Sequence, residues 1–392
     1  MTDFQKGVVN LIKSALCSTK EDLPAGFDFS EAYALGKSHQ ILPLLYYGAV
    51  NSGIKLDSQM KALLENATMQ NVLVNQKQMY LVKVVFAAFE KNEISYMPLK
   101  GTLLKGVYPK PEMRPMSDAD ILIKEEEYDK ISSVLQGLGF KEKYESNHEL
   151  VWKKSVLTLE LHKSLIPTYH KDYYNYFGNG WKLAKERIDN FGYKMKYEDA
   201  LIYNFTHMAK HYRAGGIGIR HIIDVYMCFP KESQLDYNYV KAELKNLKLW
   251  EFFCNVLDTV KVWFGEKESN EKTDFITDYI FSSGSYGTAE RQNIGEALKS
   301  AKNIGSSEKV MSKRRISLVF PSYKAMCLRN PVLKKCPPLL PVMWVVRWFE
   351  LLIFGRDTIK RQTRNLKKVT AENIDSFEDS LKFVGLEFNF EE

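Results

Sequence analysis

Apolar positions recur every three or four residues through the first 92 residues of the chain. Phe4, Val8 and Leu11 show this spacing in the first segment, and it is the spacing of one face of an α-helix. The pattern predicts helices over Phe4–Leu16, Ala32–Val50 and Met60–Glu90. We therefore expect an N-terminal helical region over residues 1–92.

From residue 93 the pattern changes to short β-prone runs. Asp118–Ile123, with the sequence DADILI, alternates acidic and apolar residues, which is typical of a strand with one polar face. Three prolines in Tyr108–Ser117 indicate a loop before this strand. The other predicted strands are Ile94–Met97, Phe140–Tyr144, Glu149–Lys153 and Leu157–His162, and the predicted helices are Leu99–Val107 and Glu125–Leu138. This order predicts an α+β unit over residues 93–166.

The helical pattern returns over residues 167–300, where we expect a helical domain. Its predicted helices are Glu198–Lys210, Gly218–Phe229 and two more within Lys231–Phe264. Lys267–Ile304 is polar and rich in Gly and Ser, which predicts a long loop. Residues 301–392 are predicted as a region of helical pieces interrupted by Pro331, Pro337, Pro338 and Pro341.

Composition is that of a globular protein: apolar residues make up 45% and charged residues 26% of 392 residues. It excludes extensive disorder and the collagen, coiled-coil and disulfide-scaffold classes. The net charge of +7 is uneven, because residues 301–368 hold 16 Lys and Arg against three acids, whereas residues 369–392 carry a net −6. Residues 1–300 are neutral. A polyanion or membrane-surface partner is therefore expected only at residues 301–368.

Targeting features are weak. The five cysteines form no CxxC pair, and the N-terminus lacks the apolar core of a signal peptide. The most apolar stretch, Leu339–Phe354, is 16 residues long and contains Arg347 and Glu350, so it is too short for a transmembrane helix. We expect a cytoplasmic protein without a transmembrane segment.

Three acidic residues carry the main chemical signal. Asp118 and Asp120 point to the same face of a strand, and Glu160 alternates with leucines in LTLELH on a later strand. Carboxylates at such a short separation repel one another unless a cation lies between them, and Mg²⁺ prefers oxygen ligands. The pattern therefore predicts a two-metal site for phosphoryl or nucleotidyl transfer. The alternative is a solvated strand face.

Two further features could bind phosphate. Lys100-Gly101-Thr102 lies between a strand and a short helix, where Gly lets the backbone approach an anion. The Walker A pattern and GxGxxG are both absent. Arg114 precedes the acidic pair by four residues and could clamp a triphosphate, the alternative being a surface arginine.

His207 and His211 share a helix face, which suggests a zinc site. Met208 stands where HExxH requires Glu, so the zincin interpretation fails. A polar patch facing a cleft, or buried core histidines, is favoured over zinc. No pattern for nucleophilic catalysis is present.

The order Gly101-Thr102, Asp118-x-Asp120 and Glu160 resembles the nucleotidyltransferase superfamily with the DNA polymerase β-like fold. More closely, PLKGTLLKGVYPKPEMRPMSDADILI is similar to an uncharacterised bacterial nucleotidyltransferase family. Residues 39–47, 159–165 and 320–347 are also similar to that family. The resemblance implies a polymerase β-like core, a small mixed sheet with flanking helices, over residues 93–166.

The resemblance also implies a reaction. Asp118, Asp120 and Glu160 would bind Mg²⁺ (or Mn²⁺), and Glu160 would position or deprotonate an acceptor hydroxyl. The triphosphate of a donor such as ATP would contact Lys100, Gly101, Thr102 and Arg114. The acceptor stays open between a sugar phosphate, RNA and protein. Lys100-Gly101-Thr102 departs from the usual Gly-Ser step, and the 15-residue loop from Leu103 to Ser117 is long.

Two other functions stay open from sequence. One is a non-catalytic protein that binds nucleic acid or an anionic surface through residues 301–368. The other is a degenerate enzyme that binds nucleotide without transferring it. The basic block could also simply pack against the acidic residues 369–392.

Overall fold

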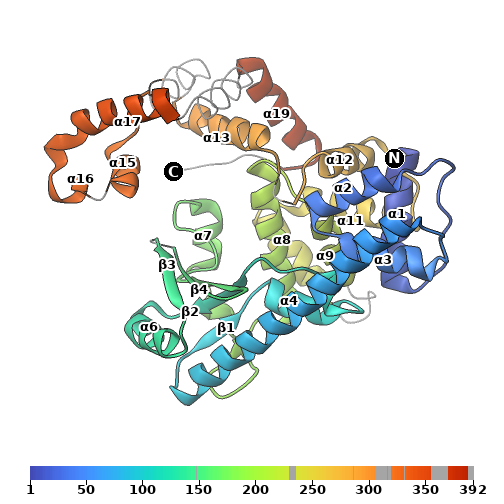
Figure 1. Cartoon of the computed structure of the whole chain (residues 1–392), viewed down its shortest axis with the longest axis horizontal. Coiled ribbons are helices and arrows are strands. Elements are labelled where there is room, and N and C mark those ends of the chain that lie inside the picture. Colours follow the sequence, from blue (N-terminus) through green and yellow to red (C-terminus); the bar gives the residue numbers. More distant parts are fainter. Residues whose placement is uncertain are drawn as a thin grey trace.

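The computed structural model describes residues 1–146, 148–228, 235–285, 287–304, 316, 319–330, 332–354 and 370–386. A small mixed sheet lies at one end of the molecule, and helices make up most of the rest, which confirms the α+β class (Figure 1). Within these residues, no helix has the length and apolar character needed to cross a membrane.

Four helices precede the sheet: α1 (Asp3–Cys17), α2 (Phe29–His39), α3 (Leu42–Asn51) and α4 (Ser58–Lys91). The prediction of one helix over Ala32–Val50 was wrong, because the chain breaks between α2 and α3. Gln40 adopts a left-handed conformation with φ 57°, and Pro43 lies in the first turn of α3, where it donates no hydrogen bond. The break lets α3 turn and pack against α1.

The contact between α1 and α3 depends on Gly48. A Cβ at this position would lie 2.0 Å from the Leu11 carbonyl oxygen, so no side chain fits. We expect Gly48→Ala to lower the free energy of unfolding by about 1–3 kcal/mol, the usual effect of overpacking. Urea denaturation measures this. Gly137→Ala in a helix facing open space is the matched control, and an equal loss there would contradict the packing argument.

The sheet has the strand order β1-β2-β5-β4-β3, with β2 and β5 parallel and the other pairs antiparallel. Its strands are β1 (Tyr96–Pro98), β2 (Ala119–Ile123), β3 (Lys141–Glu145), β4 (Glu149–Lys154) and β5 (Leu157–His162). Between them lie α5 (Gly101–Leu104), the 3₁₀ turns Lys105–Val107, Pro111–Met113 and Glu125–Glu127, and α6 (Tyr128–Gly137). The five predicted strands are confirmed to within two residues at each end.

One face of the sheet is covered by α4 and α6. Ala119 and Ile121 of β2 are fully buried in an apolar cluster with Phe89 of α4, and Leu159 and Leu161 of β5 are buried in the same cluster. Figure 1 shows α4 running along the sheet. Because side chains alternate along a strand, Asp120 and Glu160 point to the opposite face.

That opposite face looks toward the central helices. The elements after the sheet are α7 (Lys171–Phe177), a 3₁₀ turn (Trp181–Leu183), the ribbon β6 (Glu186–Arg187) and β7 (Tyr193–Lys194), α8 (Tyr197–Arg213), α9 (Ile219–Cys228), α10 (Tyr237–Asn246), α11 (Trp250–Trp263), α12 (Glu271–Phe281) and α13 (Ala289–Ile304). Their apolar side chains and those of α1–α3 share one large core.

The prediction of a long loop over Lys267–Ile304 was wrong, because α12 and α13 occupy most of it. Asn270 caps α12 by accepting hydrogen bonds from the backbone of Lys272 and Thr273. Ile276 and Ile280 lie one helical turn apart and are fully buried. The Gly- and Ser-rich run falls between the two helices rather than across the segment.

The C-terminal region contains α15 (Tyr323–Arg329), α16 (Val332–Lys335), a 3₁₀ turn (Pro337–Leu339), α17 (Leu340–Phe354) and α19 (Ala371–Phe383). Pro337 and Pro338 lie in the turn between α16 and α17, as predicted, but Pro341 lies in the first turn of α17 and does not interrupt a helix. Pro331 lies outside the described residues. Much of the basic block over residues 301–368 also lies outside the described residues, namely 305–315, 317–318 and 355–368. The predicted contact of this block with a polyanion or a membrane surface therefore stays a prediction. The helix α19 packs on α13 through buried Ile374 and Leu381.

Candidate functional site

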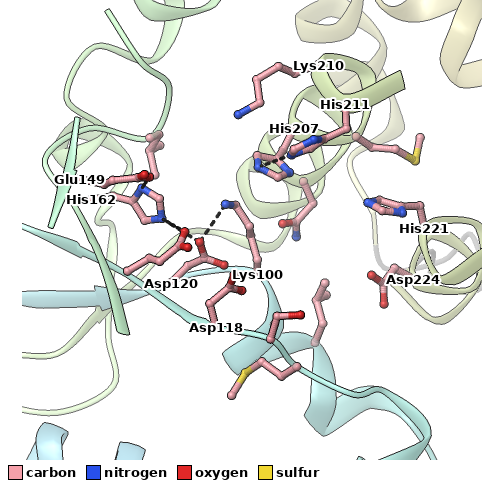
Figure 2. A pocket seen from close by; sticks show the side chains of 18 of the residues that line it. Lys100, Asp118, Asp120, Glu149, His162, His207, Lys210, His211, His221 and Asp224 are labelled. Atoms are coloured by element: carbon pink, nitrogen blue, oxygen red, sulfur yellow. Dashed lines mark hydrogen bonds and ion pairs between the residues drawn. The ribbon is translucent and has the colours of Figure 1, made fainter. Parts of the chain in front are cut away.

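A cavity of about 910 Å³ lies between the open face of the sheet and helices α8 and α9. Figure 2 shows its two walls: Asp118, Asp120, Glu149 and His162 lie on the sheet side, and His207, Lys210, His211, His221 and Asp224 lie on the helices opposite. Six of the seven predicted site residues line the cavity: Lys100, Gly101, Arg114, Asp118, Asp120 and Glu160. Thr102 does not, and its buried hydroxyl has no hydrogen-bond partner among the described residues.

The three predicted acids line the sheet side of this cavity, and Asp120 and Glu160 approach one another within 4.8 Å. Asp120 lies directly opposite Glu160 in the parallel pairing of β2 with β5, and Asp118 immediately precedes β2. Burial and the neighbouring acids raise the pKa of Glu160 to about 8 and also raise the pKa of Asp118. The ionised carboxylates therefore repel one another, and a cation between them would relieve that repulsion.

Two basic side chains already contact Asp120. Its Oδ1 accepts hydrogen bonds from Lys100 Nζ at 3.0 Å and from His162 Nε2 at 2.7 Å. Burial alone raises the pKa of Asp120, but Lys100 and His162 lower it to well below the usual value. His162 was missed by the sequence prediction, although it lies two residues after Glu160 and thus on the same strand face.

A strained turn brings Lys100 into the site. Its backbone has φ 39° and ψ −114°, which directs the side chain back toward Asp120. The next residue, Gly101, begins α5, and a Cβ there would lie 3.0 Å from Arg114 Nη1 and 3.3 Å from Met116 Cγ. Burial lowers the pKa of Lys100, but the Asp120 carboxylate outweighs it and raises that pKa above its ordinary value.

Arg114 faces Asp224 rather than the acidic cluster. Its Nε and Nη2 donate to the two Asp224 oxygens at 2.7 and 2.9 Å, and the Tyr108 hydroxyl donates to the same carboxylate at 2.7 Å. Burial favours the uncharged forms of both partners, yet the close pairing raises the pKa of Arg114 and lowers the pKa of Asp224. This ion pair fastens the Pro-rich loop to α9.

The helical wall carries His207, Lys210 and His211 from α8 and His221 from α9 (Figure 2). The Nε2 atoms of His207 and His211 lie 3.2 Å apart. Burial lowers the pKa of both imidazoles well below 6.5, so they are neutral at physiological pH. The polar-patch interpretation is the one the geometry supports, because the groups of possible metal ligands found in the described residues exclude both.

Lys210 is the notable cation of this wall. No hydrogen bond or ion pair holds its ammonium group in the part of the chain that the structure describes. Burial and the positive charge of Lys100 lower the pKa of Lys210 to about 8. A half-buried cation without a counter-ion, opposite a cluster of acids, is suited to an anionic ligand that reaches across the cavity.

Two overlapping groups have the composition and spacing to hold a metal ion. One is Asp120, Glu160 and His162, and the other is His148, Glu149 and His162. Within each group the possible ligand atoms lie within 4.8 Å of one another. The second group was not found from sequence. In the sequence, Glu149 was predicted only as the first residue of a strand, and His148, just before it, was given no role.

Comparison with known proteins gives one match. The family model described as "Uncharacterised nucleotidyltransferase" matches residues 25–265. Curated proteins and solved structures give no match. The matched segment contains every residue named above as lining the cavity, whereas α12, α13 and the C-terminal region lie outside it.

Proposed function

Because the chain belongs to this family of uncharacterised nucleotidyltransferases, we propose that it moves a nucleoside monophosphate from a nucleoside triphosphate to an acceptor hydroxyl. The observation that carries the proposal is that Asp118, Asp120 and Glu160 line one cavity, with Asp120 directly opposite Glu160 in the sheet. The cavity is large enough for a nucleotide, since ligand sites commonly measure about 300–1,000 Å³.

The donor set fits Mg²⁺ or Mn²⁺. Asp118, Asp120 and Glu160 supply only carboxylate oxygens, which these hard cations prefer. Lys100 and His162 both bond Oδ1 of Asp120, so Oδ2 is the oxygen we assign to a metal ion. When bound, the ions would neutralise charge on the triphosphate and on the leaving pyrophosphate.

The chain's own residues position the reactants. The acceptor oxygen would form a bond to the α-phosphorus while the bond from that phosphorus to the bridging oxygen breaks, releasing pyrophosphate. Glu160 would take the proton of the acceptor hydroxyl. Lys100 and Gly101 would meet the β- and γ-phosphates, with Thr102 behind them, and Arg114 would act by holding the loop against Asp224.

Transfer of label tests the proposal directly. The full chain is incubated with each α-³²P-labelled triphosphate, Mg²⁺ or Mn²⁺, and sugar phosphates, RNA or the protein itself as acceptor. A mass gain of one nucleotidyl unit on an acceptor is the expected result. Absence of transfer with every donor and acceptor, or equal transfer by Asp118→Asn, would reject it.

Lys210 should bind the phosphates of the donor. We expect Lys210→Met to raise the KM for the triphosphate by about 10-fold or more, since a charge-assisted hydrogen bond contributes about 1.5–3 kcal/mol. The pKa near 8 means that the ammonium form is lost as the pH rises, so the wild-type KM should increase from pH 7 to 9.

Steady-state kinetics over that pH range check this prediction. Lys61→Met, on an exposed position of α4, is the matched control and should leave KM unchanged. A Lys210→Met enzyme with wild-type KM, or with the same pH dependence of KM as wild type, would remove Lys210 from the binding site.

A further inference from the structure

A second group of possible ligands lies beside the acidic cluster, at the ends of β4 and β5. His148 immediately precedes β4, Glu149 is its first residue, and His162 ends β5. Glu149 Oε2 lies 4.0 Å from His162 Nδ1, and the two imidazole rings are 5.3 Å apart between centroids. Figure 2 shows Glu149 on one side of His162 and Asp120 on the other. All of these residues line the cavity.

The two nitrogens of His162 have different surroundings. Nε2 lies 2.7 Å from a carboxylate oxygen of Asp120, which can only accept, so Nε2 carries the proton. In the neutral imidazole, Nδ1 then presents a bare lone pair. This atom is fully buried and finds no hydrogen-bond partner among the described residues, and the residue as a whole is 4% exposed. A buried acceptor without a partner is unfavourable, and a metal ion bound to this nitrogen would remove that cost.

His148 is oriented by its neighbours in a similar way. The Ser164 hydroxyl donates its single proton to the Ile166 carbonyl at 2.9 Å. Ser164 Oγ must therefore accept from His148 Nδ1, which lies 3.2 Å away. That assignment places the proton on Nδ1 and leaves the lone pair of Nε2 available. A hydrogen bond from the non-ligating nitrogen is the usual support for a metal-bound histidine.

We infer that His148, Glu149 and His162 form a site for a divalent transition-metal ion of the zinc class, separate from the carboxylate site for Mg²⁺. Two imidazoles and one carboxylate are a preferred zinc set and leave a fourth position open toward the cavity. His162 Nδ1 and Glu149 Oε2 are 4.0 Å apart, close to the distance of about 3.3 Å that separates two ligand atoms on one tetrahedral zinc ion. Glu149, 29% exposed, has room to close the difference.

Such an ion would be linked to the acidic cluster through one imidazole. His162 would bind the ion through Nδ1 and donate to Asp120 through Nε2, which is the carboxylate–histidine–metal arrangement. Zinc would thereby fix the position of Asp120. The inference stands on these contacts and does not depend on the proposed transfer reaction.

Metal binding to the full-length, chelator-treated protein tests the inference without any nucleotide. We expect one equivalent of Zn²⁺ to bind in the presence of millimolar Mg²⁺, and Co²⁺ to give the visible absorption of a tetrahedral site. His148→Gln and Glu149→Gln should each weaken Zn²⁺ affinity at least about 100-fold. Ser164→Ala, which removes the hydrogen bond to His148 Nδ1 together with the one to the Ile166 carbonyl, should weaken it about 10-fold.

Matched controls locate the ion. His207→Gln removes an imidazole from the opposite wall, and Asp118→Asn removes a carboxylate of the Mg²⁺ site; both should keep wild-type Zn²⁺ affinity. Three results would overturn the inference: no Zn²⁺ binding by wild type, wild-type Zn²⁺ affinity in His148→Gln and Glu149→Gln, or a loss of affinity in Asp118→Asn as large as in those two variants. Circular dichroism of each metal-free variant separates loss of the site from loss of folding, and the two ligand variants provide independent readings if one fails to fold.

Discussion

Asp118→Asn should reduce nucleotidyl transfer by about 10³-fold or more while leaving the protein as stable as wild type or more stable. The loss follows because one of three carboxylates that would hold Mg²⁺ becomes neutral. The stability follows from electrostatics: burial and Asp120 raise the pKa of Asp118, so its ionised form at neutral pH opposes folding. Asn keeps the shape and removes that charge.

Two measurements separate these effects. Single-turnover rates with the labelled donor report transfer, and urea denaturation at pH 7 reports the free energy of unfolding. Mg²⁺ should raise the melting temperature of wild type but not of the variant, because only the former binds it well. The control is Asp129→Asn, an exposed Asp of α6 outside the cavity. A destabilised Asp118→Asn protein would show that the carboxylate is held by a partner rather than repelled.

Arg114→Met should lower the free energy of unfolding by about 3–5 kcal/mol, the usual effect of leaving one buried charge without its partner. The guanidinium makes two hydrogen bonds to Asp224, and the side chains are only 11% and 17% exposed. Because Met retains much of the apolar part of the Arg114 side chain, the loss of unfolding free energy measures the effect of removing the positive charge. Lys272→Met, which breaks the exposed pair with Glu251, should cost less than about 1 kcal/mol.

The pH dependence gives a second check on that ion pair. Although burial alone raises the pKa of Asp224, Arg114 and the Tyr108 hydroxyl bring it below the usual value. Its stabilising effect is therefore complete above the unfolded pKa of about 3.9 and disappears as the pH falls through the folded pKa. Arg114→Met should show its largest deficit at neutral pH and a smaller one near pH 3. A deficit that does not change with pH would assign the effect to packing instead.

The acidic cluster could be predicted from sequence because the strand pattern is local. Leucine alternates with Thr158, Glu160 and His162 in β5, and the buried Ala119 and Ile121 flank Asp120 in β2. The face of Asp120 and Glu160 is therefore fixed by the residues beside them. The same alternation places His162 with Glu160. The signal for His162 was therefore present, and only the choice of acids as the sole metal ligands concealed it.

Other parts depend on distant partners that no local pattern reveals. Arg114 pairs with Asp224, 110 positions later, so its guanidinium faces a helix that the sequence does not place beside it. Lys100 reaches Asp120 through a backbone conformation that is rare for lysine. In α12, the capping residue Asn270 and the buried Ile276 and Ile280 were a helical signal, but the Gly- and Ser-rich run nearby dominated the prediction.

The parallel pairing of β2 with β5 also determines when the site is made during folding. His162 and Asp120 are 42 positions apart, and α6, β3 and β4 lie between them. The antiparallel pair β4–β5 closes through a short turn, whereas docking β2 on β5 must close the longer loop. We expect the carboxylates to meet only in this late step, after the rate-limiting barrier. Relief of their repulsion, by metal or by Asp118→Asn, should then slow unfolding and leave the refolding rate nearly unchanged.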